Sequence, residues 1–122
     1  KEDIHPYQIE GMGKNLIPAA LLFDKIDEFV RVNDEMAAYR TREIALKEAI
    51  MGGYTTGAVT QGLLQYANSH EFKKDDLVVA LFPDHGSRYI TKVYSDEWMA
   101  EQGFINNCVH NYDEVYKTEY IK

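Results

Sequence analysis

The sequence has little cysteine, no apolar run long enough for a membrane helix, and no cluster of basic residues. Its one cysteine, Cys108, excludes an internal disulfide and favours a reducing compartment, so we expect a cytoplasmic protein. The longest apolar run, residues 17–23, contains Pro18 and is far shorter than the roughly 20 residues that span a bilayer. The formal net charge of −7 argues against nucleic acid and anionic membranes as partners, because both recruit basic surfaces.

Metal-ligand spacing is also missing. The histidines are scattered along the chain and predict no metal site; they are His5, His70, His85 and His110. His85 follows Asp84 directly, but neighbours in sequence seldom direct their side chains together, so a loop histidine is expected rather than a catalytic dyad. A length of 122 residues, with 45% apolar and 27% charged residues, indicates one soluble globular domain.

Hydrophobic periodicity predicts an α/β fold with a partial, open and mainly parallel sheet flanked by helices. Strand-like patterns occupy residues 7–9, 28–32 and 77–82, the last (LVVALF) typical of a buried parallel strand. Helical patterns occupy the segment after a cap at Asn33 or Asp34, residues 57–67, and two short pieces at 88–93 and 95–102. A sheet of only three strands has uncovered edges and apolar faces. We therefore expect a homo-oligomer.

The most site-like stretch is residues 52–58 (GGYTTGA). Gly52 and Gly53 permit a tight backbone turn, and Thr55 or Thr56 is expected to cap the following helix. A helix start of this kind attracts anions and polar ring atoms. A well-capped helix after a glycine turn, without any ligand, explains the same residues, so local sequence leaves both interpretations open.

Three loops are expected to line one cleft. They are the Gly11–Gly13 loop, the turn at residues 53–57, and the Pro83–Ser87 loop. Each follows a predicted strand or apolar segment, and ligands bind at the carboxyl edge of open α/β sheets. The Gly11–Gly13 pair lacks the third glycine of a dinucleotide fingerprint, and a plain turn remains an alternative there.

Five short motifs, in order, resemble the cystathionine β-synthase and cysteine synthase family. They are IEGMG (9–13) with Ile17-Pro18, Asn33-Asp34-Glu35, GGYTTGA (52–58), LFPD (81–84) with Ser87-Arg88-Tyr89, and SDEWM (95–99) with Gly103-Phe104. The resemblance covers about Tyr7 to Phe104, and its last motif leans toward cystathionine β-synthase. It implies a fold-type-II pyridoxal-phosphate enzyme, with residues 1–104 as the C-terminal part of the core and 105–122 as a polar tail.

The resemblance also implies roles for five cofactor-binding residues. In the family a hydroxyl, usually of serine, contacts the pyridine nitrogen of the cofactor, and Thr55 matches it, with Gly53 in the same turn. Pro83, followed by Asp84, falls near the ring-nitrogen side. Gly11 and Gly13 fall in the loop that walls the opposite side. A neutral hydroxyl leaves the ring a weaker electron sink than a carboxylate does, which suits β-elimination.

Two required parts lie upstream of these motifs in the family: the Schiff-base lysine and the phosphate loop. No lysine here has the expected Ser-x-Lys surroundings, so no catalytic residue is assigned. This chain alone is expected to be inactive and not to retain pyridoxal 5′-phosphate, which belongs to the parent enzyme. Lys92 is expected to be a surface helix residue. Lys14 lies where some relatives place a substrate-facing tyrosine, and both a contact with a substrate carboxylate and a solvated loop lysine stay open.

Two hypotheses for function follow. In the first, the chain is the C-terminal fragment of a pyridoxal-phosphate-dependent enzyme of sulfur amino-acid metabolism, acting by β-elimination or β-replacement on serine- or cysteine-type amino acids. In the second, it is a self-standing, non-catalytic α/β module that binds a ligand or a protein through the same cleft. A first residue other than methionine, Lys1, favours the fragment.

Overall fold

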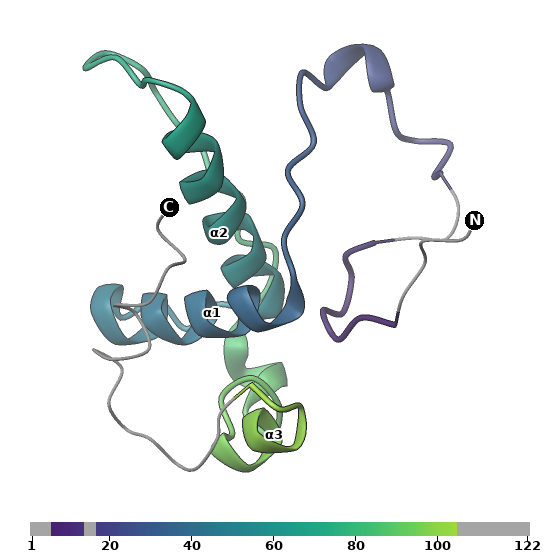
Figure 1. The fold of residues 1–122 in the computed structure, drawn as a ribbon, viewed down its shortest axis with the longest axis vertical. Helices are drawn as coiled ribbons and strands as arrows, with labels where there is room; N and C mark the ends of the chain where they lie inside the picture. Colours follow the sequence, from purple (N-terminus) through teal and green to yellow (C-terminus); the bar gives the residue numbers. More distant parts are fainter. Residues whose placement is uncertain (1–5, 14–16, 105–122) are drawn as a thin grey trace.

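A computed structural model describes residues 6–13 and 17–104, and its elements are helical. In order they are the 3-10 helix η1 (Phe23–Lys25), α1 (Asp34–Glu48), α2 (Tyr54–Ser69), the 3-10 helix η2 (Gly86–Tyr89) and α3 (Asp96–Glu101). α1 and α2 cross at the centre. Most of α2 extends from one side of α1, and α3 lies on the other side (Figure 1). The segment before α1 and the segment after α2 are extended.

Local capping explains where α1 begins. The Asn33 side chain accepts a 2.8 Å hydrogen bond from the Met36 N–H, and Asp34 and Glu35 place negative charge at the positive end of the helix dipole. The helix ends at Ala49, which adopts the left-handed conformation with φ 56°. The expected cap at Asn33 is therefore confirmed.

Small side chains let α1 and α2 pack closely. Ala37 and Ala38 are fully buried on α1, and Gly57 and Ala58 are buried on α2. The buried Thr41 hydroxyl bonds to the main-chain oxygens of Ala37 at 2.8 Å and, more weakly, Tyr54 at 3.2 Å, so it links the two helices. These small residues remove the side-chain bulk that would otherwise separate the helices.

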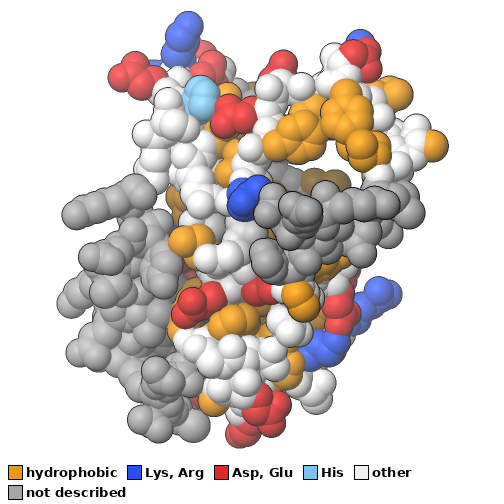
Figure 2. Space-filling view, turned by 45° about the vertical axis from the view of Figure 1, so that its right-hand side comes forward, with side chains coloured by type: hydrophobic (Ala, Val, Ile, Leu, Met, Phe, Trp, Pro, Cys, Tyr) orange, Lys and Arg blue, Asp and Glu red, His pale blue; other side chains and the backbone are white. Residues whose placement is uncertain are grey.

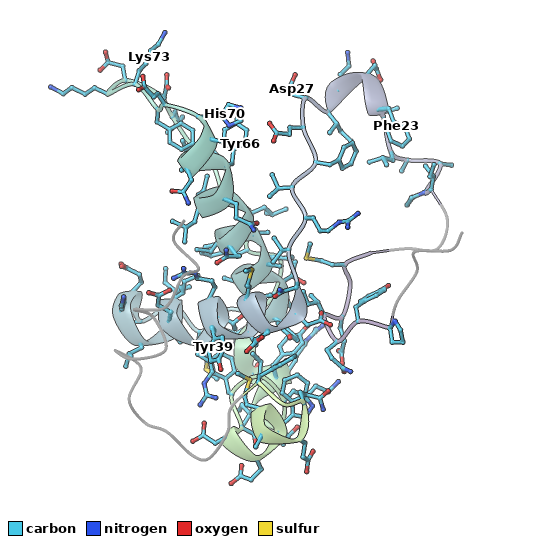
Figure 3. The ribbon with its side chains drawn as sticks, viewed as in Figure 1. Phe23, Asp27, Tyr39, Tyr66, His70 and Lys73 are labelled. Carbon is cyan, nitrogen blue, oxygen red and sulfur yellow. The ribbon has the colours of Figure 1, made fainter. Side chains whose placement is uncertain are left out.

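Aromatic side chains join α3 to this helix pair. Ser95 caps α3 by accepting from the Trp98 N–H at 3.2 Å, as the sequence predicts. The Trp98 ring meets Tyr54 edge-on at a centroid distance of 6.1 Å, and Met99 is fully buried. Tyr39 extends from α1 on the side of α3 (Figure 3) and donates to the Phe104 main-chain oxygen. Trp98 and Met99 therefore face inward, as expected.

The predicted sheet is wrong for the described residues. No strand forms within residues 6–13 and 17–104, where the β-type pairing found is an isolated bridge between Gly52 and His85. Residues 77–82 are extended but exposed, with Leu77 at 89% and Val79 at 83% of full accessibility. Residues 7–9 and 28–32 likewise lack ladder partners. An apolar, β-favouring run forms a strand only where a neighbour completes its hydrogen bonds, and local sequence does not specify that neighbour.

The extended segments leave apolar side chains in solvent. The large exposed ones before α1 are Tyr7, Ile17, Leu22, Phe23, Phe29 and Val30. Hydrophobic side chains gather at the upper right of the space-filling view, on the side of this segment (Figure 2). No helix in the described part of the chain is long and apolar enough to cross a membrane.

Some expectations fall outside the described residues. These are the polar tail 105–122, Cys108, His5, His110 and Lys14. The division at residue 104 stays a prediction.

Candidate functional site

A cavity of about 280 Å³ lies beside the first turn of α2. Its lining comes from two loops, from the first turn of α2 and from η2, and consists of Glu10, Gly11, Thr55, Pro83, Asp84 and Tyr89. The cavity therefore brings together Thr55, Pro83 and Gly11 from the predicted set. Residues from all three expected loops line the cavity, but residues 54–57 form the first turn of α2, and the cavity lies at this helix start and not at a sheet edge.

Thr55 occupies the first turn of α2 with its hydroxyl toward the Gly11 loop. The hydroxyl donates to the main-chain oxygen of Glu10 over 3.2 Å, which is long for a bond between oxygens. The expected threonine cap is wrong, because Gly53 is the N-cap and no side chain caps the helix. The Thr56 hydroxyl is buried, and within the described structure it has no hydrogen-bond partner. Thr55 is thus the turn hydroxyl available to a ligand.

Gly53 lies behind the cavity, pressed against the Pro83–Ser87 loop. Its N–H donates to the main-chain oxygen of Asp84 at 2.8 Å. A Cβ atom at this position would lie 1.9 Å from Oδ1 of Asp84 and 2.9 Å from the Tyr89 ring. Glycine is required here because a carboxylate occupies the place of a side chain.

Further hydrogen bonds fasten the turn before α2 to the segment that follows Pro83. The Gly86 N–H donates to the Met51 main-chain oxygen at 2.8 Å, and the Tyr94 hydroxyl donates to the Gly52 oxygen at 2.7 Å. The Gly86–Met51 bond and the Gly53–Asp84 bond flank Gly52 and His85 and make the isolated bridge between them. Residues 51–53, which lead into the helix turn of Thr55, are therefore each bonded to the segment of residues 84–94.

Tyr89, on η2, was not among the expected site residues. Its hydroxyl donates to Oδ2 of Asp84 at 2.8 Å, and only 6% of the residue is exposed. Burial raises the pKa of Tyr89, and the hydrogen bond to the Asp84 carboxylate and its charge add to the increase. The signal available in the sequence was the Ser87-Arg88-Tyr89 motif, which the resemblance used without assigning Tyr89 a role.

Gly13 does not line the Thr55 cavity, although Gly11 does. It lines a neighbouring cavity of about 560 Å³ together with Tyr7, Met12 and Asp34. The Tyr7 hydroxyl donates to the Gly13 main-chain oxygen at 2.7 Å, and the Asp34 carboxylate accepts from the Gln8 N–H at 2.8 Å. The Gly11–Gly13 loop thus separates two hollows.

Curated relatives place the chain among known proteins. No protein-family model matches it. Cystathionine β-synthase of Saccharomyces cerevisiae is 32% identical over 110 residues, which is 89% of this chain and 22% of the relative. Cysteine synthase of Buchnera aphidicola is 31% identical over 99 residues, 80% of this chain and 30% of the relative. The chain is a distant homologue of the cystathionine β-synthase and cysteine synthase family.

A third relative is named for a different product. N-(2-amino-2-carboxyethyl)-L-glutamate synthase of Cupriavidus metallidurans is 34% identical over 94 residues, 76% of this chain and 28% of the relative. The chain therefore spans less than a third of the length of the curated relatives it matches. The family resemblance stated from the motifs is confirmed by these matches.

Charged residues flank the cavity of this cystathionine β-synthase homologue. Lys92 forms an ion pair with Glu10, which ties the Gly11 loop to the segment after η2, and both side chains are about half exposed. Lys92 thus lies near the surface, as expected, but in a turn after η2 and not in a helix, and it contacts the cavity lining. His85 accepts from the Ser87 N–H through Nδ1 at 3.1 Å, as a loop histidine. Within the described residues, no group of three or more acidic, histidine or cysteine side chains is placed to hold a metal.

Proposed function

We propose that the chain is the part of a pyridoxal-phosphate-dependent enzyme, resembling cystathionine β-synthase, that contacts the pyridine-nitrogen end of the cofactor. The parent enzyme would act by β-elimination or β-replacement on serine- or cysteine-type amino acids. The observation that carries the proposal is the shared cavity of Thr55, Pro83 and Gly11. These residues come from three motifs of the family resemblance, far apart in the sequence.

The cavity fits one end of such a cofactor. Its volume of about 280 Å³ lies at the lower limit of small-ligand pockets. A cavity that would hold only one end of the cofactor is consistent with a chain that spans 22% of the yeast relative. We expect the Schiff-base lysine and the phosphate loop to come from the remainder of the parent enzyme, so this chain alone is proposed to be inactive.

The donor group suits a neutral ring nitrogen. When bound, pyridoxal phosphate withdraws electrons from the α-carbon of an amino acid, which allows a β-substituent to leave or be exchanged. The Thr55 hydroxyl carries one proton and two lone pairs, and its 3.2 Å bond to Glu10 is weak enough to be exchanged for a bond to a ring nitrogen. Thr55 thus orients the ring without transferring charge to it. Pro83 and Gly11 would lie beside the same end of the ring.

A probe without an aldehyde tests the proposal. Pyridoxine 5′-phosphate keeps the ring nitrogen but forms no Schiff base, and its fluorescence reports binding to the 122-residue chain. We expect Thr55→Ser to retain binding and Thr55→Val to weaken it by about fivefold or more, because the hydrogen bond is lost. Thr60→Val is the control, since the Thr60 hydroxyl bonds to the Thr56 main-chain oxygen at 2.9 Å within α2 and does not line the cavity.

Two results would contradict the proposal. One is absence of probe binding by the wild-type chain, which would favour a non-catalytic protein-binding module. The other is a stable yellow adduct with pyridoxal phosphate that disappears when one internal lysine is replaced, because the chain would then hold its own Schiff-base lysine.

A further inference from the structure

A chain of contacts runs from Tyr89 to the turn that presents Thr55. The Tyr89 hydroxyl holds Oδ2 of Asp84 at 2.8 Å, and Oδ1 of the same carboxylate lies against Gly53, 1.9 Å from where a Cβ atom would be. The main-chain oxygen of Asp84 accepts the Gly53 N–H at 2.8 Å. Asp84 therefore contacts Gly53 through both its side chain and its main chain.

The position of this carboxylate matters because Asp84 lines the same cavity as Thr55. An anionic carboxylate near a pyridine nitrogen favours the protonated ring and competes with a neutral hydroxyl as its partner. The hydrogen bond from Tyr89 occupies one carboxylate oxygen, and the packing against Gly53 confines the other. The raised pKa of Tyr89 agrees with a phenol that stays protonated and continues to donate.

We propose that Tyr89 is a positioning residue of this cavity, which fixes the Asp84 carboxylate against Gly53 and thereby fixes the turn that carries Thr55. The inference rests on the proposed function for its consequence, the alignment of the Thr55 hydroxyl with a ring nitrogen. Its structural part, the restraint of Gly53 by Tyr89 through Asp84, is independent of any ligand.

The restraint is measured by amide hydrogen exchange on the full chain. In Tyr89→Phe the ring remains and the hydroxyl is lost, so we expect the Gly53 N–H to exchange about fivefold faster or more, while the Val93 and Met99 amides change little. Tyr39→Phe is the matched control, because it removes a phenol that donates to the Phe104 main-chain oxygen away from the cavity. Circular dichroism confirms that each variant is folded.

Variants at Asp84 separate positioning from general stability. Asp84→Asn keeps an oxygen that can accept from Tyr89, and we expect it to protect the Gly53 amide better than Asp84→Ala does. An unchanged Gly53 rate in Tyr89→Phe would overturn the inference. Equal acceleration of the Gly53, Val93 and Met99 amides would overturn it too, because Tyr89 would then act on the whole fold.

Binding of pyridoxine 5′-phosphate tests whether the restraint of Gly53 by Tyr89 affects the cavity that Thr55 lines. We expect Tyr89→Phe to weaken the probe by a factor similar to that for Thr55→Val, and the double variant to lose little more, because both changes act on one contact. Additive losses would overturn the link to Thr55. If the wild-type chain binds no probe, the proposed function fails, and the Gly53 exchange rate still decides whether Tyr89 restrains the turn.

Discussion

The α-carbon of Gly57 on α2 packs directly against the main-chain oxygen of Ala37 on α1. A Cβ atom on Gly57 would lie 1.9 Å from that oxygen and 2.2 Å from the Thr41 hydroxyl oxygen. The Thr41 main-chain nitrogen would lie 2.5 Å away, and main-chain atoms of α1 cannot move away without a shift of the helix. The crossing of the two long helices thus depends on the absence of one methyl group.

We expect Gly57→Ala to lower the free energy of unfolding by about 3 kcal/mol, because α2 must shift away from α1. The matched control is Gly62→Ala in the same helix, where the nearest atom to a new Cβ is Val32 Cγ2 at 3.7 Å. That change should raise stability by about 0.5–1 kcal/mol, since alanine favours helix. Urea unfolding of the three proteins measures both effects, and equal midpoints would refute the close-packing argument.

Stability should depend on the ionisation of Glu43. Burial by itself would raise the pKa of Glu43, but hydrogen bonds from Lys47 and Arg40, with their charges, outweigh it and hold the pKa below its ordinary value of 4.5. A carboxyl with a lowered pKa in the folded state stabilises the fold above its unfolded pKa, and this contribution disappears as the pH falls through the folded value.

Glu43→Gln should therefore destabilise the chain by about 2 kcal/mol at pH 7, and the difference from wild type should shrink as the pH falls below about 4.5. Denaturant unfolding across this pH range gives the comparison. Glu48→Gln, at an exposed position near the end of the same helix, is the control and should have little effect. A difference for Glu43→Gln that stays constant with pH would show that the ion pair does not couple to folding.

The first turn of α1 offers a test of capping. Asn33→Ala removes the 2.8 Å bond to the Met36 N–H and should cost about 1 kcal/mol in thermal or urea unfolding. Asn68→Ala, an exposed position in the last turn of α2, serves as the control for loss of an asparagine. Equal stability of wild type and Asn33→Ala would mean that water replaces the cap without loss.

Exposed apolar side chains should drive self-association. Val79 and Leu81 are 83% and 74% exposed on the segment after α2, and solvent-exposed apolar clusters mark interaction surfaces. Sedimentation velocity should show association that increases with concentration and decreases in the double variant Val79→Lys and Leu81→Lys. Leu46→Lys, at a 62% exposed position on α1, should leave association unchanged. A wild-type chain that stays monomeric at high concentration would contradict the expectation.

The helices, and the caps of α1 and α3, were predictable because their signals are local. The bond between Asn33 and Met36, or between Ser95 and Trp98, joins residues three apart in the sequence. The strand predicted at residues 77–82 does not form. Its apolar, β-branched pattern indicates a preference for burial, but a strand also requires a neighbouring strand, which the local pattern does not specify.

Three of the five expected site residues line one cavity, and their role there stays a prediction. Motifs in the correct order identified the loops of Gly11, Thr55 and Pro83, which line one cavity. The threonine cap failed, because two glycines pressed against the Asp84 loop place the N-cap at Gly53. Tyr89 was missed, because its contact with Asp84 depends on the 3-10 turn between them and not on a residue type.

The fastening of the turn before α2 also bears on how sequences of this kind can diverge. The bonds from Gly53 to Asp84 and from Gly86 to Met51 use main-chain atoms alone. Side chains at positions such as Met51 and His85 can therefore be exchanged over evolutionary time without moving Thr55. These two bonds therefore tolerate a change of side chain at Met51 and His85, because they depend on atoms that every residue except proline shares.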